Sequence, residues 1–341
     1  MSAAPTITSF DPMSREFIID PQAAFQDLYR EAPVFFYEPL NAYYVLPYEE
    51  VKHVIADDET FSSHAFQAMP VPPRLRDRIP EEWERVGRTI MGGQTINMDA
   101  PDHTWHRRAM QQAFTRRRVE GVKPLVGEVA NELIDGLADQ GSCDVMRDFA
   151  SQVTLRVVTT MLALPPHMLE GFQAWIVNMF TLLAPIDLKP EDVSIPDDQL
   201  VTIYERVHGN YRTYENLLNE RRANPGDDLA SAMLELTDDE GNPRFTSDQV
   251  LTHLVGITTA GVDTSSNLIV NMVRYFTESP DQLQLVLDEP ALWDNAVQEG
   301  IRRSAISTQL FRISTRESEL CGVTIPAGAT IVQSLAAANG D

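Results

Sequence analysis

Apolar residues recur at three- and four-residue steps through most of the chain after residue 101, and this spacing predicts amphipathic helices. The longest of these helices, 246–279, has Thr246 and Gln249 in a capping-box arrangement at its start and Pro280 after its end. Helix 126–137 carries one continuous apolar stripe. The other predicted helices are 102–114, 149–162, 169–183, 199–222 and 227–236.

Both ends of the chain show a different pattern. Residues 33–37 and 43–46 are apolar, aromatic and β-branched around a short polar break, which predicts a hairpin. A helix is expected to open at 47–50. Strand-like alternation returns near the C-terminal end, with 326–328 as a turn, in the segments 309–313, 319–321, 323–325 and 330–335.

Residues 67–97 are rich in proline, arginine and glycine with little periodicity, so we expect a long loop there, of the kind that often forms a functional lid. No linker or repeat divides the chain. We therefore predict one mainly α domain with small β-sheets over 1–341: mixed β/α in 1–100, helical in 101–308 and a small sheet in 309–341.

Composition narrows the classes of protein. Fifty acidic and 27 basic residues give a net charge of −23, which argues against nucleic acid as a partner because phosphate binding needs a cationic surface. The two cysteines, Cys143 and Cys321, form no CxxC motif or disulfide framework. Neither a signal peptide nor an uncharged apolar span of about 18 residues is present. These features predict a soluble, cytoplasmic protein without a membrane partner.

The middle of the long helix carries Ala260-Gly261-Val262-Asp263-Thr264-Ser265-Ser266. Glycine costs a helix about 1 kcal/mol against alanine, and buried polar groups must find partners. A chain accepts both where a ligand must come close to the backbone. The alternative, a packing site with a threonine bonded back to the helix, is equally consistent with these residues alone.

Three more groups of residues could carry chemistry. His103 and Arg107 lie four apart on one helix face, where they could hold a carboxylate. Glu299 and Arg302 lie three apart, and Arg312 stands within a predicted strand. Each also has a simpler explanation as a solvated charge. No third ligand accompanies His103 and His106, so a zinc site is not expected, and no hydrolase or nucleotide-binding motif is present.

Together and in this order, these features resemble the haem-thiolate monooxygenases of the cytochrome P-450 superfamily, in its soluble bacterial form. Further matching segments are 61–63, 99–103, 226–229 and 336–339, so the resemblance covers essentially the whole chain. It implies the cytochrome P-450 fold, a large helical domain with small β-sheets, with 67–97 as the B–C loop. That loop and 169–183 would line the substrate pocket.

The resemblance also implies roles for single residues. His103, Arg107 and Arg312 would bind the propionates of haem b (iron protoporphyrin IX), because buried carboxylates need charge-assisted partners. Asp263 and Thr264 would deliver protons to iron-bound oxygen. The pair Ala260 and Gly261 would lie beside the haem, with Gly261 leaving room for oxygen and substrate. Glu299 and Arg302 would be structural.

The implied activity is insertion of one oxygen atom from O2 into a small, mainly apolar organic substrate. Electrons would come from a ferredoxin or flavin-type donor, for which Arg107, Arg108, Arg116, Arg117, Arg118 and Lys123 form a cationic cluster. A solvated helix end explains the same cluster. The substrate and the position of attack depend on pocket shape, which the sequence does not specify.

The chain departs from the family at the iron ligand. The family's cysteine thiolate stands in a glycine-rich loop beyond the region of Asn339, and neither Cys143 nor Cys321 stands in such a loop. We therefore expect a fragment that ends before the cysteine-ligand loop and is inactive by itself. The rival interpretation is a non-catalytic helical remnant, or a binder of hydrophobic ligands, that lacks the haem thiolate.

Overall fold

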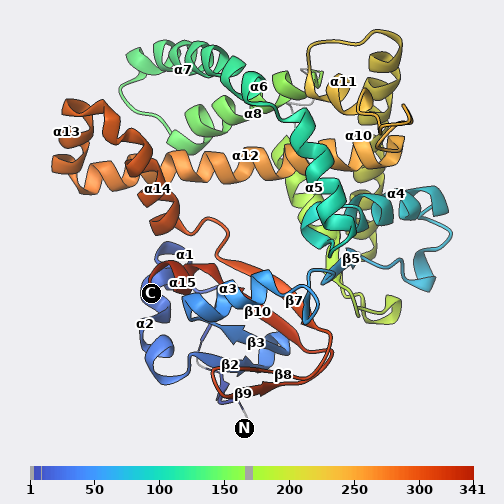
Figure 1. The fold of residues 1–341 in the computed structure, drawn as a ribbon, viewed down its shortest axis with the longest axis vertical. Coiled ribbons are helices and arrows are strands. Elements are labelled where there is room, and N and C mark those ends of the chain that lie inside the picture. Colours follow the sequence, from blue (N-terminus) through green and yellow to red (C-terminus); the bar gives the residue numbers. More distant parts are fainter. Residues whose placement is uncertain (1–3, 9, 166–171) are drawn as a thin grey trace. The chain divides into compact units, whose positions relative to one another are not determined.

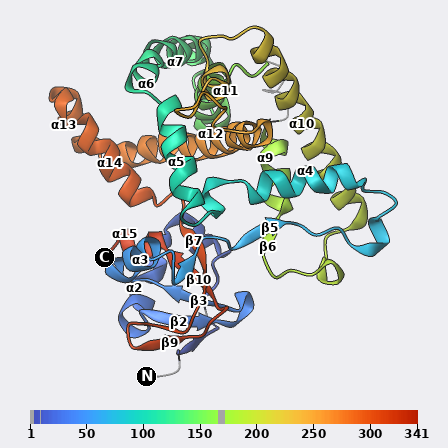
Figure 2. The same ribbon diagram turned by 45° about the vertical axis from the view of Figure 1, so that its right-hand side comes forward.

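The computed structural model describes residues 4–8, 10–165 and 172–341. The chain forms two compact units, which we call the first unit (residues 1–65 and 267–341) and the second unit (residues 66–266). Figures 1 and 2 show helices through most of the ribbon, with the longer strands in the blue and red parts of the chain. No helix in the described part of the chain is long and apolar enough to cross a membrane.

The first unit is built on a six-stranded sheet in the order β1-β2-β3-β10-β7-β4, with β8 and β9 as a separate hairpin. Its strands are β1 (Thr6–Ile7), β2 (Val34–Tyr37), β3 (Ala42–Val45), β4 (Phe61–Ser62), β7 (Gln309–Ser314), β8 (Ser318–Leu320), β9 (Val323–Ile325) and β10 (Thr330–Ser334). Its helices are α1 (Arg15–Ile19), α2 (Pro21–Glu31), α3 (Tyr48–Ala56), α13 (Pro280–Asp288), α14 (Trp293–Ser304) and α15 (Leu335–Asn339).

The predicted N-terminal hairpin is confirmed, since β2 and β3 pair antiparallel. The central strand β10 then joins the two ends of the chain by pairing parallel to β3 and antiparallel to β7. Alternate residues of β3 face opposite sides of the sheet. Tyr44 packs with Phe25 of α2 in an aromatic cluster, and Val45 packs with Val51 of α3 in an aliphatic one. Helices therefore cover both faces of this sheet.

The second unit is almost entirely helical. Its helices are α4 (Glu81–Gly92), α5 (Asp102–Ala113), α6 (Arg116–Gly121), α7 (Lys123–Leu137), α8 (Ser151–Leu162), α9 (Phe172–Leu182), α10 (Asp197–Ala223), α11 (Leu229–Leu234) and α12 (Ser247–Glu278) as far as Ser266. The strands β5 (Phe66–Ala68) and β6 (Leu183–Pro185) pair antiparallel. These helices confirm the pattern predicted from apolar spacing, apart from 169–171, which lie outside the described residues.

The long helix α12 begins where the sequence predicts. Its capping box is formed in both directions, because the Thr246 amide donates to Gln249 Oε1 at 2.8 Å and the Gln249 amide donates to Thr246 Oγ1 at 3.2 Å. The helix ends at Glu278, two residues before Pro280. Residues from Asn267 onward belong to the first unit.

The prediction of a loop over 67–97 is wrong. This segment contains most of β5 and the whole of α4. The buried residues Val86, Ile90 and Met91 of α4 stand at helical spacing and pack in the core of the second unit. The surrounding prolines and arginines obscure this short apolar face, which was therefore missed.

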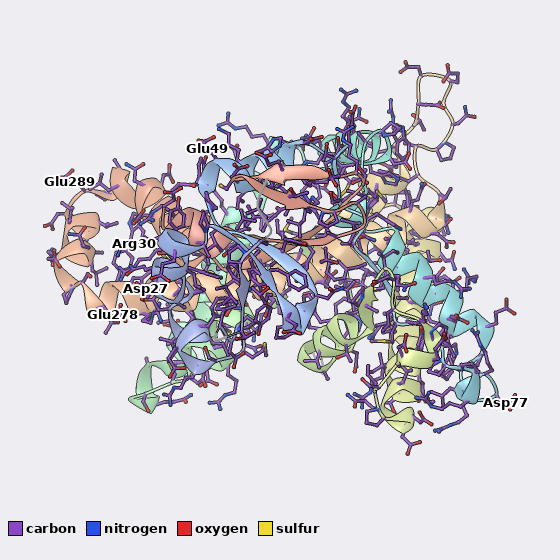
Figure 3. The ribbon with its side chains drawn as sticks, turned by 90° about the horizontal axis from the view of Figure 1, so that it is seen from below. Asp27, Arg30, Glu49, Asp77, Glu278 and Glu289 are labelled. Carbon is purple, nitrogen blue, oxygen red and sulfur yellow. The ribbon has the colours of Figure 1, made fainter. Side chains whose placement is uncertain are left out.

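The apolar stripe predicted on α7 forms a helix but little core. Val129 is buried, whereas Val126 is 38% exposed and Ile134 is 52% exposed. Charged groups elsewhere in the chain also point outward. Figure 3 shows Asp77, Glu49 and Glu289 among the side chains at the surface, as a net charge of −23 would lead one to expect.

Gln333 on β10 is the least well satisfied side chain of the sheet. Its residue is 0% exposed, and neither Nε2 nor Oε1 has a hydrogen-bond partner among the described residues. Its same-face neighbour on the strand, Ile331, belongs to the aliphatic cluster under α3. Leaving a buried polar group unsatisfied costs about 1–3 kcal/mol.

We therefore predict that Gln333→Leu raises the free energy of unfolding by about 1–3 kcal/mol, measured by urea denaturation. The matched control is Gln309→Leu on the neighbouring strand β7, because Gln309 Oε1 accepts a hydrogen bond from Tyr44 Oη at 3.3 Å. That variant should be destabilised. A destabilised Gln333→Leu would show that the carboxamide is satisfied in solution.

Candidate functional site

The helix α5 carries His103 and Arg107, four residues apart. His106, Ala109 and Ala113 are buried, so the face of α5 that carries them packs inside the second unit. His103 is half-buried and Arg107 is exposed at the edge of that face. Within the described residues, neither Arg107 nor its neighbour Arg108 forms an ion pair with a carboxylate of the chain. Arg107 is therefore available to an external anion.

Several hydroxyl groups of α12 donate to the backbone of the helix itself. Thr264 Oγ1 donates to the Ala260 carbonyl at 2.6 Å, and Ser266 Oγ donates to the Val262 carbonyl at 2.8 Å. Thr258 Oγ1 bonds to the Leu254 carbonyl at 2.7 Å and accepts from Tyr214 Oη at 2.9 Å. The back-bonded threonine considered from the sequence is thus present. Because the Thr264 hydroxyl already donates its one hydrogen bond to the Ala260 carbonyl, Thr264 Oγ1 can only accept a further hydrogen bond.

Glycines let two other groups approach α12 closely. A Cβ at Gly261 would lie 3.4 Å from Cγ2 of Val158, so the direction of its missing side chain faces α8. A Cβ at Gly256 would lie only 2.2 Å from Oε1 of Gln94, whose Nε2 also donates to the Thr252 carbonyl at 3.3 Å. Sequence reasoning missed Gln94 and Gly256. A second glycine in the same helix, one turn before Ala260, was the available signal.

A pair of buried histidines was also missed. His106 Nδ1 and His253 Nε2 lie 2.8 Å apart and join α5 to α12. Burial lowers the pKa of His106, and burial together with His106 lowers the pKa of His253 to about 4. The described residues contain no group of three His, Cys, Asp or Glu side chains able to hold a metal ion.

In the first unit, Glu299 and Arg302 form a two-bond ion pair. Arg302 Nε and Nη2 each lie 2.7 Å from a Glu299 carboxylate oxygen, which lowers the pKa of Glu299. Arg302 Nη1 also donates to the Asn339 carbonyl at 2.5 Å, and the Arg302 carbonyl accepts from Gln22 Nε2 at 3.0 Å. This residue therefore links α14 to α15 and α2.

Arg312 lies in the first unit, on β7 opposite Ile331 of β10. Its side chain is half-buried, and Nη1 donates to the Phe311 carbonyl at 2.8 Å. The other candidate residues divide between the units, with His103, Arg107 and 260–264 in the second and Glu299 and Arg302 in the first.

The surroundings of the two cysteines differ. Cys143 is exposed. Cys321 stands at the turn between β8 and β9, and burial and the nearby Glu50 carboxylate raise the pKa of its thiol to about 11. Both effects favour the protonated thiol.

The cationic cluster predicted near the end of α5 is only partly available. Arg116 pairs with Glu120 at 2.8 Å, and Arg118 Nη1 donates to the Ala113 carbonyl at 3.2 Å. Among the described residues, Arg117 and Lys123 are exposed without an ion pair.

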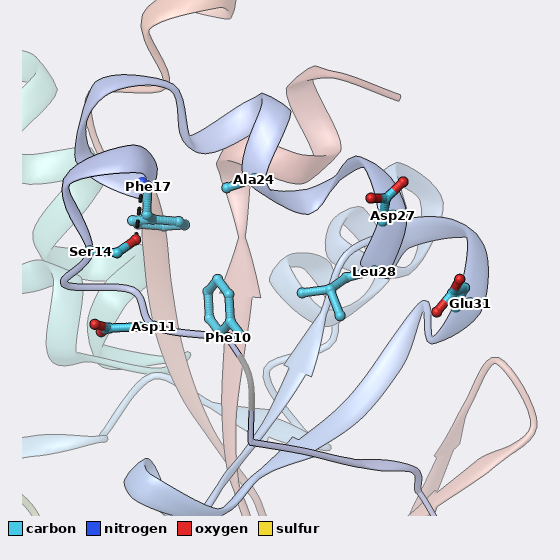
Figure 4. Close-up of a pocket in the computed structure, with 8 residues that line it drawn as sticks. All are labelled: Phe10, Asp11, Ser14, Phe17, Ala24, Asp27, Leu28 and Glu31. Carbon is cyan, nitrogen blue, oxygen red and sulfur yellow. Dashed lines mark hydrogen bonds between the residues drawn. The ribbon is translucent and has the colours of Figure 1, made fainter.

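A pocket of about 360 Å³ opens in the first unit, and all its lining residues come from the segment 10–31. Figure 4 shows Phe10, Phe17 and Leu28 lining it, with the carboxylates of Asp27 and Glu31 on α2 at one side. None of the predicted site residues contributes to it.

Comparison with known proteins places the chain in a family. Residues 74–289 match the family model described as Cytochrome P450. The vitamin D(3) 25-hydroxylase of Pseudonocardia autotrophica is 32% identical over 276 residues, which cover 80% of this chain and 64% of that protein. The mycinamicin IV hydroxylase/epoxidase of Micromonospora griseorubida is 28% identical over 304 residues, covering 88% of this chain and 70% of that protein.

Solved structures agree with the sequence comparisons. The cytochrome P450 CYP109Q5 of Chondromyces apiculatus superposes with a TM-score of 0.78 at 25% identity, over 97% of this chain and 77% of that one. The chain therefore has the mainly helical fold with small sheets that the sequence predicted, although it spans less than two thirds of the vitamin D(3) 25-hydroxylase. It belongs to the cytochrome P450 family.

Proposed function

We propose that the protein containing this chain is a haem-dependent monooxygenase. It inserts one oxygen atom from O2 into a small, mainly apolar organic molecule, with electrons from a ferredoxin or flavin-type donor. The observation that carries this proposal is the family match over residues 74–289. Two relatives whose names describe hydroxylation support it.

The fit of haem b to this chain can be judged from its own residues. Arg107 is exposed and has no carboxylate partner among the described residues, and His103 lies one turn before it on α5. Such a pair suits a propionate, which needs a cationic or hydrogen-bonding partner. We assign Arg312, half-buried on β7, the same role. Cys321 does not fit the iron, because its thiol favours the protonated form.

Haem iron, when bound, would supply oxygen activation. The residues of α12 would donate and accept the hydrogen bonds through which protons are transferred. Thr264 Oγ1 is held as an acceptor by its bond to the Ala260 carbonyl. To pass a proton on, Thr264 must release Ala260 and take a proton in turn, for which we assign Asp263 as the source. We place Ala260 and Gly261 beside the cofactor. Glu299 and Arg302 hold α14 against α15 and take no part in the chemistry.

A hydrophobic-ligand binder without redox chemistry is the second candidate. The raised pKa of the Cys321 thiol, which makes that residue a poor iron ligand, favours it. The two functions are separated by purifying the protein as its gene encodes it and recording the reduced carbon monoxide spectrum. A thiolate-ligated haem band supports the monooxygenase. A protein that takes up no haem, or binds it without a thiolate, supports the binder.

Arg107→Ala should weaken haem binding by about tenfold or more, because a hydrogen bond to a charged group contributes about 1.5–3 kcal/mol. Binding is followed by the absorbance of haem titrated into the haem-free protein. Arg108→Ala is the matched control, since Arg108 is adjacent, also exposed and likewise without an ion pair among the described residues. Equal effects of the two substitutions would remove Arg107 from the propionate site.

Thr264→Ala should lower the product formed per electron severalfold, with the lost electrons recovered as peroxide, because proton delivery then fails. Thr277→Ala is the control. Thr277 is an exposed threonine of the same helix whose Oγ1 is bonded back to the Val273 carbonyl at 2.8 Å. Coupling unchanged by Thr264→Ala, or reduced equally by both changes, would contradict the relay.

Charge reversal at Arg117 and Lys123 should slow reduction by the electron donor about tenfold at low salt and flatten its salt dependence, because exposed charges steer association. Arg116 and Arg118 are left intact because both have partners within the chain. Arg15→Glu together with Arg30→Glu, both exposed in the first unit, changes the net charge by the same amount and is the control (Figure 3). A reduction rate equal to that of the control would leave this cluster as a solvated helix end.

A further inference from the structure

The buried contact between His106 of α5 and His253 of α12 has no role in the function proposed above. The two residues are 6% and 3% exposed, and their ring nitrogens lie 2.8 Å apart. Aromatic rings close around them. Phe245 stacks on His106 with centroids 5.6 Å apart, and Trp105 meets both His106 and Phe245 edge-on. Water is thus largely excluded from the pair.

The hydrogen bond fixes how many protons the pair can hold. A neutral imidazole has one donor and one acceptor nitrogen, so one proton between Nδ1 of His106 and Nε2 of His253 makes the bond. One added proton leaves the bond possible but creates a charge in an apolar site. A second added proton turns both facing nitrogens into donors and breaks the contact.

We propose that His106 and His253 are a positioning pair, which in its neutral form holds α5, and with it His103 and Arg107, against α12, and which releases α5 in mild acid. The consequence for haem rests on the proposed function, whereas the attachment of α5 to α12 does not. His103 lies one turn before His106 and Arg107 directly follows it, so movement of this face moves both residues.

The charged groups near the pair do not offset its burial. On α5, Asp102 raises the pKa of His106 and His103 lowers it, and burial is the largest effect. On α12, His253 experiences burial and then His106. The segment packed on both rings contributes the uncharged Phe245, and α11, which also packs on α5, contains no charged residue.

Both imidazoles therefore have a lower pKa in the folded protein than the ordinary 6.5. Between about pH 6.5 and about pH 4 the unfolded chain then binds more protons than the folded chain, so the free energy of unfolding rises with pH in that range. The contribution of the pair is complete above about pH 6.5 and is lost as the pH falls toward 4.

The test is a double variant that keeps the hydrogen bond and removes the titration. Asparagine places its amide near the position of Nδ1 and glutamine places its amide near that of Nε2, so His106→Asn with His253→Gln restores one N–H···O bond. Urea midpoints of the haem-free protein are measured from pH 7.5 to 4.5. His53→Asn, an exposed histidine on α3, is the control.

The wild-type protein and the His53→Asn control should lose stability together below pH 6.5, with the unfolding equilibrium constant rising by up to about tenfold per pH unit for each proton taken up. The double variant should match them at pH 7.5 and show a shallower loss. If it does not fold, proton NMR titration of the wild-type imidazoles decides, and two rings that titrate near pH 6.5 overturn the proposal. A double variant that follows the wild type at every pH also overturns it.

Haem retention is measured separately on the haem-loaded protein. Its half-life should shorten between pH 7 and 5 in the wild type by at least severalfold more than in the double variant. If the stability result holds and haem loss is the same in both proteins, the pair positions α5 but His103 and Arg107 do not hold the haem. That outcome contradicts the proposed site and leaves the helix attachment standing.

Discussion

The second unit depends on how α12 satisfies polar groups inside a buried helix. Thr258 and Ser266 each donate to a carbonyl one turn earlier in the helix and each meet a hydroxyl from a neighbouring element, Tyr214 and Thr154 respectively. Without these bonds each buried hydroxyl would cost about 1–3 kcal/mol. Because they are made, α12 can carry a polar run through the core and present Asp263 and Thr264 without loss of the helix.

Close approaches to α12 complete this arrangement. Gly261 lets Val158 of α8 pack close to the helix backbone, and Gly256 does the same for the carboxamide of Gln94. The contact of His106 with His253 attaches α5 at a point about 10 Å along the helix axis from Ala260. Three surrounding segments are therefore fixed to the same helix by a small residue, an amide and an imidazole pair. The position of a haem-binding surface on α5 would be determined by these contacts.

The sequence predicted elements whose signals are local. The capping box at Thr246 and Gln249 was predictable because both partners lie within one turn, and the hairpin around residue 40 because adjacent strands pair readily. It failed on α4, whose short apolar face stands among prolines and arginines. On α7 the apolar stripe correctly predicted a helix. It did not predict which of its side chains are buried, since Ile134 is half exposed.

For this protein, the sequence by itself determined the family and most of the helical elements, since these depend on spacing along one chain. Tertiary structure alone decided that β10 joins the two ends of the chain in one sheet, that Gln333 is buried without a partner among the described residues, and that His106 meets His253. Such contacts join residues far apart in the sequence, and their energies depend on burial. No local pattern records which distant group will exclude water from a side chain.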